Sequence, residues 1–115
     1  MKGIAIGLSH TSKVILQRLK RTEFIDEIYL ACSTYEEEIE ENEITLIKPK
    51  KVLRENWEDL ALIIFIGSIG ASVRLINSFL TSKDQDPGVI VIDNKCSKVV
   101  PLTGLHQWNT QNIAF

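Results

Sequence analysis

The chain has 115 residues, the length of one domain, and 44% of them are hydrophobic, which is enough for a core of its own. Its 13 basic and 15 acidic residues give a net charge of −2 without a basic arm, so we expect no nucleic-acid partner. An apolar pattern is beginning at Asn112–Phe115, where the sequence stops. We therefore expect a single domain over residues 1–115 that is the N-terminal module of a longer protein.

The first part of the chain predicts a strand, a helix and a second strand. Gly3–Leu8 is apolar and rich in isoleucine, and it begins without a secretion signal, so we expect a cytoplasmic protein. The polar turn Ser9–Ser12 starts a helix, and Ile25–Cys32 returns to a strand pattern. Three apolar residues are expected on the buried arc of the helix: Val14, Ile15 and Leu19.

An acidic run, Tyr35–Glu43, separates these elements from the centre of the chain. It holds six glutamates, and we interpret it as a solvated helix or loop. A short strand over Ile44–Ile47 follows, and the pattern of Lys51–Asp59 predicts a helix that leads into the central strand.

Two strands in the second half are apolar on both faces, Ala61–Ile66 and Val89–Ile92. Such strands lie inside a sheet that helices cover on both sides, which favours a parallel α/β arrangement. The longest apolar run, Leu60–Ile66, is far shorter than the roughly 20 residues of a membrane span, so we expect no membrane association.

The helix between these strands is expected over Ile69–Leu80, with Ser68 as its cap. Apolar residues at spacings of four, three and four predict its buried stripe: Ile69, Val73, Ile76 and Leu80. A polar rim on the opposite side is free to contact a ligand: Gly70, Arg74 and Asn77.

The C-terminal part predicts a hairpin. Lys83–Gly88 reads as a turn, and Asp93–Ser97 as the loop into a strand that Pro101 restricts to an edge. The fold class is therefore α/β, with a mixed, mostly parallel open sheet of about six strands, helices on both faces and a C-terminal hairpin at an edge.

Ligands of such sheets bind beyond the carboxyl ends of the parallel strands. Polar residues that follow predicted strands are Ser9, His10, Ser33, Thr34, Ser68 and Asp93, while Thr103 and His106 follow an edge strand of open direction. The turn Gly67–Gly70 places free backbone N–H groups at a helix start, and Arg74 could add a bidentate contact to a carboxylate or phosphate. Spacing alone leaves open that the glycines only permit a tight turn and that Arg74 is a surface charge.

Several kinds of site have no motif support. The glycines do not form a dinucleotide or P-loop fingerprint, so no nucleotide is expected. Cys32 and Cys96 lack the spacing of a metal site, so we expect two reduced, packed thiols and no metal. His10 and His106 are the two histidines, and no nucleophile motif stands beside them.

Phe65–Ile76 with its Gly-x-x-Val-Arg helix, then Lys83-x-x-Asp86-Pro87, then a strand ending in Asp93, resemble the N-terminal domain of the cobalamin biosynthesis protein G family. The Gly-His-x-Gly-Gly segment of that family falls here on Gly104 and His106, with bulkier residues in place of the paired glycines.

The resemblance implies a hydrolase of anaerobic cobalamin biosynthesis that opens the δ-lactone of cobalt-precorrin-5A and releases acetaldehyde. The substrate is a carboxylate-fringed tetrapyrrole that carries its own cobalt, so no cofactor is expected, and family members carry C-terminal domains that would be partners in the same chain. His106 is the candidate catalytic base, and the Ser68 and Gly70 amides are candidate stabilisers of the lactone oxyanion. The predicted substrate-binding residues are Gly67, Ser68, Gly70, Arg74, Lys83, Asp86 and Asp93.

Two other functions stay open. One is a non-catalytic docking or oligomerisation module of the same biosynthetic protein, in which Trp108 would anchor an interface and the chain could form a homo-oligomer. The other is an unrelated small-anion-binding domain of similar shape.

Overall fold

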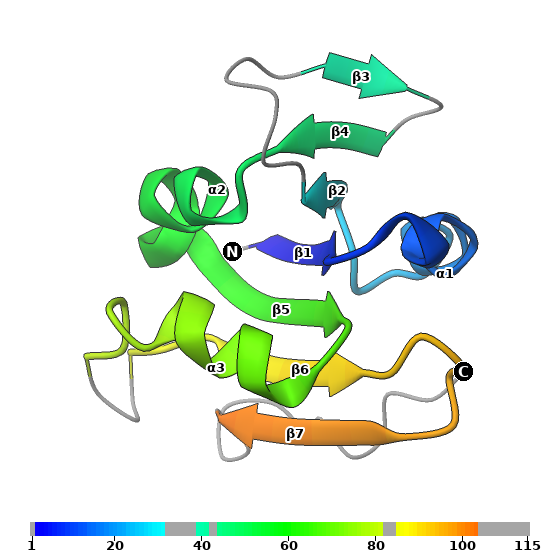
Figure 1. Ribbon diagram of the computed structural model, residues 1–115. Coiled ribbons are helices and arrows are strands. Elements are labelled where there is room, and N and C mark those ends of the chain that lie inside the picture. The colour runs from blue at the N-terminus through cyan, green and yellow to red at the C-terminus, as the bar shows by residue number, and fades with distance from the viewer. Residues whose placement is uncertain (1, 32–38, 42–43, 82–84, 104–115) are drawn as a thin grey trace.

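The computed structural model describes residues 2–31, 39–41, 44–81 and 85–103 (Figure 1). Its strands are β1 (Lys2–Gly7), β2 (Glu27–Ala31), β3 (Ile39–Glu41), β4 (Ile44–Ile47), β5 (Leu60–Ile66), β6 (Gly88–Ile92) and β7 (Val99–Thr103). Its helices are α1 (Lys13–Lys20), α2 (Pro49–Asn56) and α3 (Ile69–Ile76), with short 3-10 turns η1 (His10–Ser12) and η2 (Trp57–Asp59). No helix among the described residues has the length and apolar character needed to cross a membrane.

The strands form one sheet in the order β3-β4-β2-β1-β5-β6-β7. The five strands from β4 to β6 run parallel, while β3 and β7 pair antiparallel at the two edges. The predicted α/β class, the mostly parallel sheet and the C-terminal hairpin at an edge are thereby confirmed.

The strand β3 corrects the interpretation of the acidic run. Residues 39–41 pair with β4, with Ile39 opposite Leu46 and Glu41 opposite Ile44, where a helix or loop was expected. Backbone groups make this pairing, and an edge strand tolerates charged residues because one of its sides has no neighbouring strand. Side-chain charge was therefore a poor guide to the backbone conformation here.

Helices cover both faces of the sheet and define two cores (Figure 1). Alternate residues of β5 divide between them: Leu62, Ile64 and Ile66 pack on the α1 side, whereas Ile63 and Phe65 pack on the side of α2 and α3. These side chains are fully buried, which explains the apolar character of β5 on both faces.

Two helix faces differ from the prediction. In α1, Val14 is 66% exposed, and Leu16 joins Ile15 and Leu19 in the core instead, since residues 15, 16 and 19 lie on one side of a helix with 3.6 residues per turn. The helix α3 ends at Ile76, four residues before the predicted end, and three residues of the predicted stripe are exposed, at 47% for Ile69, 43% for Val73 and 39% for Leu80, which lies beyond the helix.

Ile76 is buried as predicted, and the unexpected buried residue of α3 is Ser72; Leu75 and, beyond the end of the helix, Phe79 pack partly against the core. Ser72 tolerates burial because its hydroxyl donates to the Ser68 carbonyl at 2.9 Å. Apolar residues therefore lie on two sides of this segment, and one of the two sides remains exposed.

The connections place a topological switch point between β1 and β5. From β1 the chain moves outward to β2 and β4, and then returns to β5 on the other side of β1 before adding β6. In open α/β sheets, ligands bind in the crevice at the carboxyl ends of strands near such a point. Three loops meet at this end of the sheet: residues 8–12 after β1, residues 67–68 after β5, and residues 93–98 after β6.

Candidate functional site

The turn from β5 into α3 depends on Gly67. Its φ of 155° is one that glycine adopts readily, and a Cβ atom there would lie 3.0 Å from the side chain of Leu8. The Gly67 amide donates to the Ile92 carbonyl at 2.9 Å, which ties the turn to β6. Because this amide is already hydrogen-bonded to β6, Gly67 lines the site but does not offer its N–H group to a ligand.

The start of α3 offers backbone donors beyond this turn. Ser68 is the N-cap, and its Oγ accepts the Ala71 amide at 3.2 Å. The first N–H groups of a helix have no intrahelical acceptor, so the amides of Ile69 and Gly70 are available to an anion within the part of the chain the structure describes. Apart from its chain neighbours and the backbone of its own helix, no described atom lies within 4 Å of a Cβ built on Gly70, which leaves its approach open.

The β6–β7 hairpin is organised by Asp93. Its carboxylate accepts the Ser97 amide at 2.7 Å, the Ser97 hydroxyl at 2.5 Å and the Lys98 amide at 3.2 Å. The hydrogen bond from the Ser97 hydroxyl is the largest cause that lowers the pKa of Asp93 below its ordinary value. Asp93 is thus ionised, and its hydrogen bonds join the two ends of the hairpin loop.

Cys96 completes this loop in a conformation that is uncommon for a residue with a side chain, at a φ of 56°. Its amide donates to the Asp93 carbonyl at 3.0 Å, and its free thiol packs against the core on the α1 side. The predicted packed, reduced thiol is confirmed for Cys96, whereas Cys32 lies outside the described residues.

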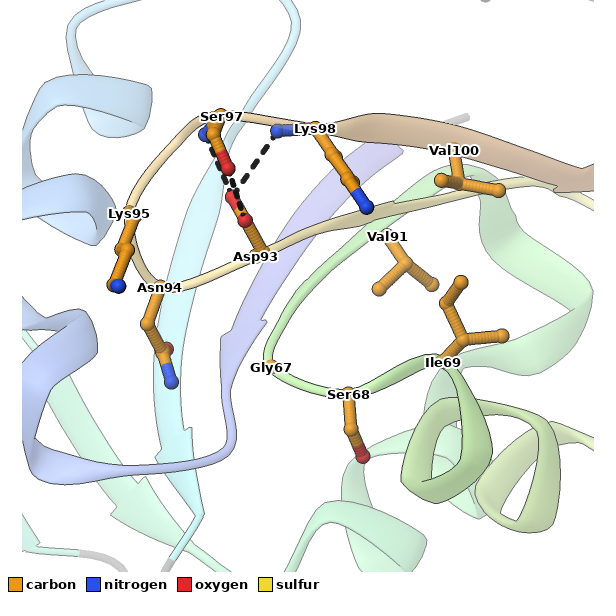
Figure 2. A pocket seen from close by; sticks show the side chains of 10 residues that line it. All are labelled: Gly67, Ser68, Ile69, Val91, Asp93, Asn94, Lys95, Ser97, Lys98 and Val100. Carbon is orange, nitrogen blue, oxygen red and sulfur yellow. Dashed lines mark hydrogen bonds between the residues drawn. The ribbon is translucent and has the colours of Figure 1, made fainter.

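The turn and the hairpin line an open pocket of about 540 Å³ (Figure 2), within the range of roughly 300–1,000 Å³ typical of small-molecule sites. One wall is apolar and consists of Ile69, Val91 and Val100. The opposite wall is polar and positively charged, and it consists of Asp93, Asn94, Lys95, Ser97 and Lys98, with Gly67 and Ser68 at the base. Such an arrangement suits a ligand with an apolar body and anionic substituents.

The pocket brings together three of the predicted site residues: Gly67, Ser68 and Asp93. Gly70 follows on the same helix start, while Arg74 is exposed near the end of α3 and is not among the residues that line the pocket. Lys83 and His106 lie outside the described residues.

Asp86 is separated from the other candidates. It precedes β6 and so lies at the end of the sheet opposite the pocket, where its buried carboxylate accepts the Thr81 amide at 2.9 and 3.0 Å and the Thr81 hydroxyl at 2.9 Å. These contacts fix the connection between α3 and β6.

The sequence reasoning missed the hairpin residues Asn94, Lys95 and Lys98. Two features of the sequence could have predicted them. The loop that contains them follows a strand whose carboxyl end faces the crevice, and it begins with an aspartate that is followed four residues later by a serine. The Ser9 hydroxyl also reaches Asn94 Oδ1 at 3.4 Å, so the loop after β1 contacts the same hairpin. Among the described residues, no cluster of three potential metal ligands occurs.

Comparison with known proteins gives a family. The model of the cobalamin synthesis G N-terminal family matches residues 51–115, more than half of the chain, and this span contains every residue that lines the pocket. No curated protein matches the chain.

A solved structure with a similar fold is a cobalamin biosynthesis protein G homolog from Sulfolobus solfataricus, with a TM-score of 0.65 and 23% sequence identity. The similarity covers 98% of the present chain but only 32% of that homolog. At this identity the likeness supports the fold, and the family match supplies the relationship: the chain belongs to the cobalamin synthesis G N-terminal family.

Proposed function

We propose that this chain binds substrate in a cobalt-precorrin-5A hydrolase, which opens the δ-lactone of a cobalt tetrapyrrole and releases acetaldehyde. The observation that carries the proposal is the two-sided pocket at the carboxyl ends of β5 and β6, with an apolar wall facing a positively charged hairpin. Membership of a cobalamin synthesis family supplies the substrate class. A tetrapyrrole matches both walls, because its macrocycle is apolar and its rim carries carboxylates.

The substrate edge would enter between Ile69 and the hairpin. Burial of the macrocycle edge against Val91 and Val100 contributes the hydrophobic part of binding, at roughly 25 cal/mol per Å² of apolar surface. Carboxylates on the rim meet lysine ammonium groups and the start of α3, where the helix dipole favours negative charge. The cobalt ion arrives within the substrate.

In the proposed reaction, water attacks the lactone carbonyl carbon and passes a proton to a general base. The ring C–O bond then breaks, and its oxygen takes up a proton, leaving a free carboxylate and a hydroxyl group. The amides of Ile69 and Gly70 are suited to stabilise the oxyanion that forms during this step. His106, outside the described residues, is the proposed base.

Loss of the carbon fragment follows as a retro-aldol cleavage. The new hydroxyl group loses its proton and becomes the carbonyl of acetaldehyde, while the adjacent C–C bond breaks and its electron pair stays on the macrocycle. No oxidant or reductant is consumed, which is consistent with a hydrolase that has no redox cofactor.

The test is to incubate the protein with cobalt-precorrin-5A and to measure acetaldehyde by coupled reduction to ethanol. We expect acetaldehyde in proportion to lactone consumed, and none with heat-denatured protein. Lactone that stays intact with folded protein would contradict the hydrolase function.

A second candidate function, docking, is favoured by the exposed apolar arc of α3. Val73 on α3 is 43% exposed and Leu80, beyond the end of the helix, is 39% exposed, while the other side of α3 packs on the sheet. As a self-association site, this arc would bury both residues against a second copy of the chain. Sedimentation at micromolar concentration should then show a dimer that Val73→Lys dissociates, and a monomer for the unmodified protein would eliminate this candidate.

A further inference from the structure

We propose that Lys98 is the specificity-determining residue of the pocket, which orients the tetrapyrrole by binding one rim carboxylate, and that Asp93 is the positioning residue that aims it. The inference rests on the proposed function, because it takes a carboxylate-fringed tetrapyrrole as the ligand. It assigns the main anionic contact to the hairpin rather than to Arg74.

Lys98 is the cation best placed for this contact. Figure 2 shows its side chain extending from the hairpin into the pocket, toward the wall that contains Val91 and Ile69. Lys95 also lines the pocket, but it lies at the tip of the hairpin on the far side of Asp93. A carboxylate beside Lys98 is therefore compatible with a macrocycle edge on the apolar wall.

The Lys98 ammonium group is in no ion pair that the structure records among the described residues. The Asp93 carboxylate attracts it without forming such a pair. Lys98 is exposed, so a ligand carboxylate can reach it from solvent. Its stem can remain on the pocket wall while the charge meets the ligand.

Asp93 fixes the backbone from which this side chain projects. Its carboxylate accepts the Lys98 amide at 3.2 Å, and its own amide donates to the Lys98 carbonyl at 3.3 Å. One residue thus holds both backbone polar groups of Lys98. The two additional bonds from Ser97 satisfy the carboxylate within the hairpin, so its contribution to the ligand is indirect.

The start of α3 supplies the opposing contact. Ile69, the first residue of α3, lines the pocket, and Gly70 follows it at a position that is open to approach. A carboxylate held between Lys98 and these amides gains a charge-assisted hydrogen bond together with the helix dipole. An apolar ligand without a carboxylate would still contact the apolar wall, but no charged contact would orient it.

The experiment is an absorbance titration of the protein with cobalt-precorrin-5A, comparing Lys98→Met with the matched control Lys50→Met on the exposed side of α2. Lys98→Met keeps the apolar stem and removes the charge. We expect its Kd to rise about tenfold, the effect of one hydrogen bond to a charged group, with a weaker salt dependence of binding. The control should bind as the unmodified protein does, and circular dichroism should show all variants folded.

The role of Asp93 is tested by a double-mutant cycle. Asp93→Ala alone should weaken binding, and Asp93→Asn should weaken it less. Adding Asp93→Ala to the Lys98→Met variant should cause no further loss of affinity. Additive losses would show that Asp93 contributes to binding independently and would overturn its positioning role.

The outcomes separate the two proposals. If the unmodified protein does not bind cobalt-precorrin-5A, the proposed function fails and the inference fails with it. If the unmodified protein binds and Lys98→Met binds equally well, or Lys50→Met loses as much affinity, the inference alone is overturned.

Discussion

Asp86→Ala should destabilise the protein without weakening tetrapyrrole binding to the folded state. The substitution removes three hydrogen bonds from Thr81 to a buried carboxylate, at 2.9, 3.0 and 2.9 Å. Each such bond contributes about 1.5–3 kcal/mol in isolation, but the three share one partner residue and are not additive. Thr81 is exposed, so water can replace part of what is lost, and we expect a net loss of about 2–3 kcal/mol.

Urea denaturation monitored by tryptophan fluorescence measures this loss, because Trp57 stacks on Phe79 with ring centroids 5.4 Å apart. With a urea m value of about 2 kcal/mol per M, the midpoint should fall by about 1–1.5 M. Asp86→Asn keeps one acceptor oxygen and should lose about 1 kcal/mol. An unchanged midpoint for Asp86→Ala, or reduced ligand affinity at full stability, would refute a structural role for Asp86 and restore it as a binding residue.

Three further outcomes follow from the geometry. Gly70→Ala should raise stability by roughly 0.5–1 kcal/mol, since its Cβ meets no described atom, yet weaken tetrapyrrole binding in a titration if the ligand approaches the helix start. Gly67→Ala should cost about 1–3 kcal/mol in thermal or urea unfolding, given its φ of 155° and a Cβ 3.0 Å from Leu8. The pKa of Glu27 is lowered first by its hydrogen bond from Lys2, so the stability this pair adds is present above the ordinary glutamate pKa and disappears as pH falls through the lowered value. Glu27 is 44% exposed, so Glu27→Gln should cost less than about 1 kcal/mol at neutral pH and progressively less as the pH falls below the ordinary glutamate pKa; a loss that does not change with pH would contradict this assignment.

The sheet could be predicted because β5 and β6 carry a strong signal. Strands that are apolar on both faces have few alternatives to the centre of a helix-covered sheet, and both strands are buried throughout apart from Ala61. The rotation of α3 could not be predicted in the same way. Of its predicted stripe, Ile76 is buried but Ile69 and Val73 are exposed, and Ser72 takes a core position that its hydrogen bond to the Ser68 carbonyl makes tolerable.

The candidate site was predictable where it depends on topology. Ser68 and Asp93 follow parallel strands, so their place at one end of the sheet is a consequence of strand direction. Lys98 was missed because its position depends on how Asp93 closes the hairpin, which requires contacts that strand patterns do not encode. Asp86 was chosen from the family motif, and the motif does not distinguish a residue that binds ligand from one that fixes a turn.

The most direct test of a tetrapyrrole site is to map cobalt-precorrin-5A onto the backbone amide resonances of the protein. We predict that shifts or line broadening concentrate at Gly67–Gly70 and Asp93–Lys98, the two sides of the pocket, and spare the opposite end of the sheet around Asp86. An unperturbed spectrum, or effects centred on Asp86 rather than on the pocket, would contradict the assignment of this pocket as the substrate site.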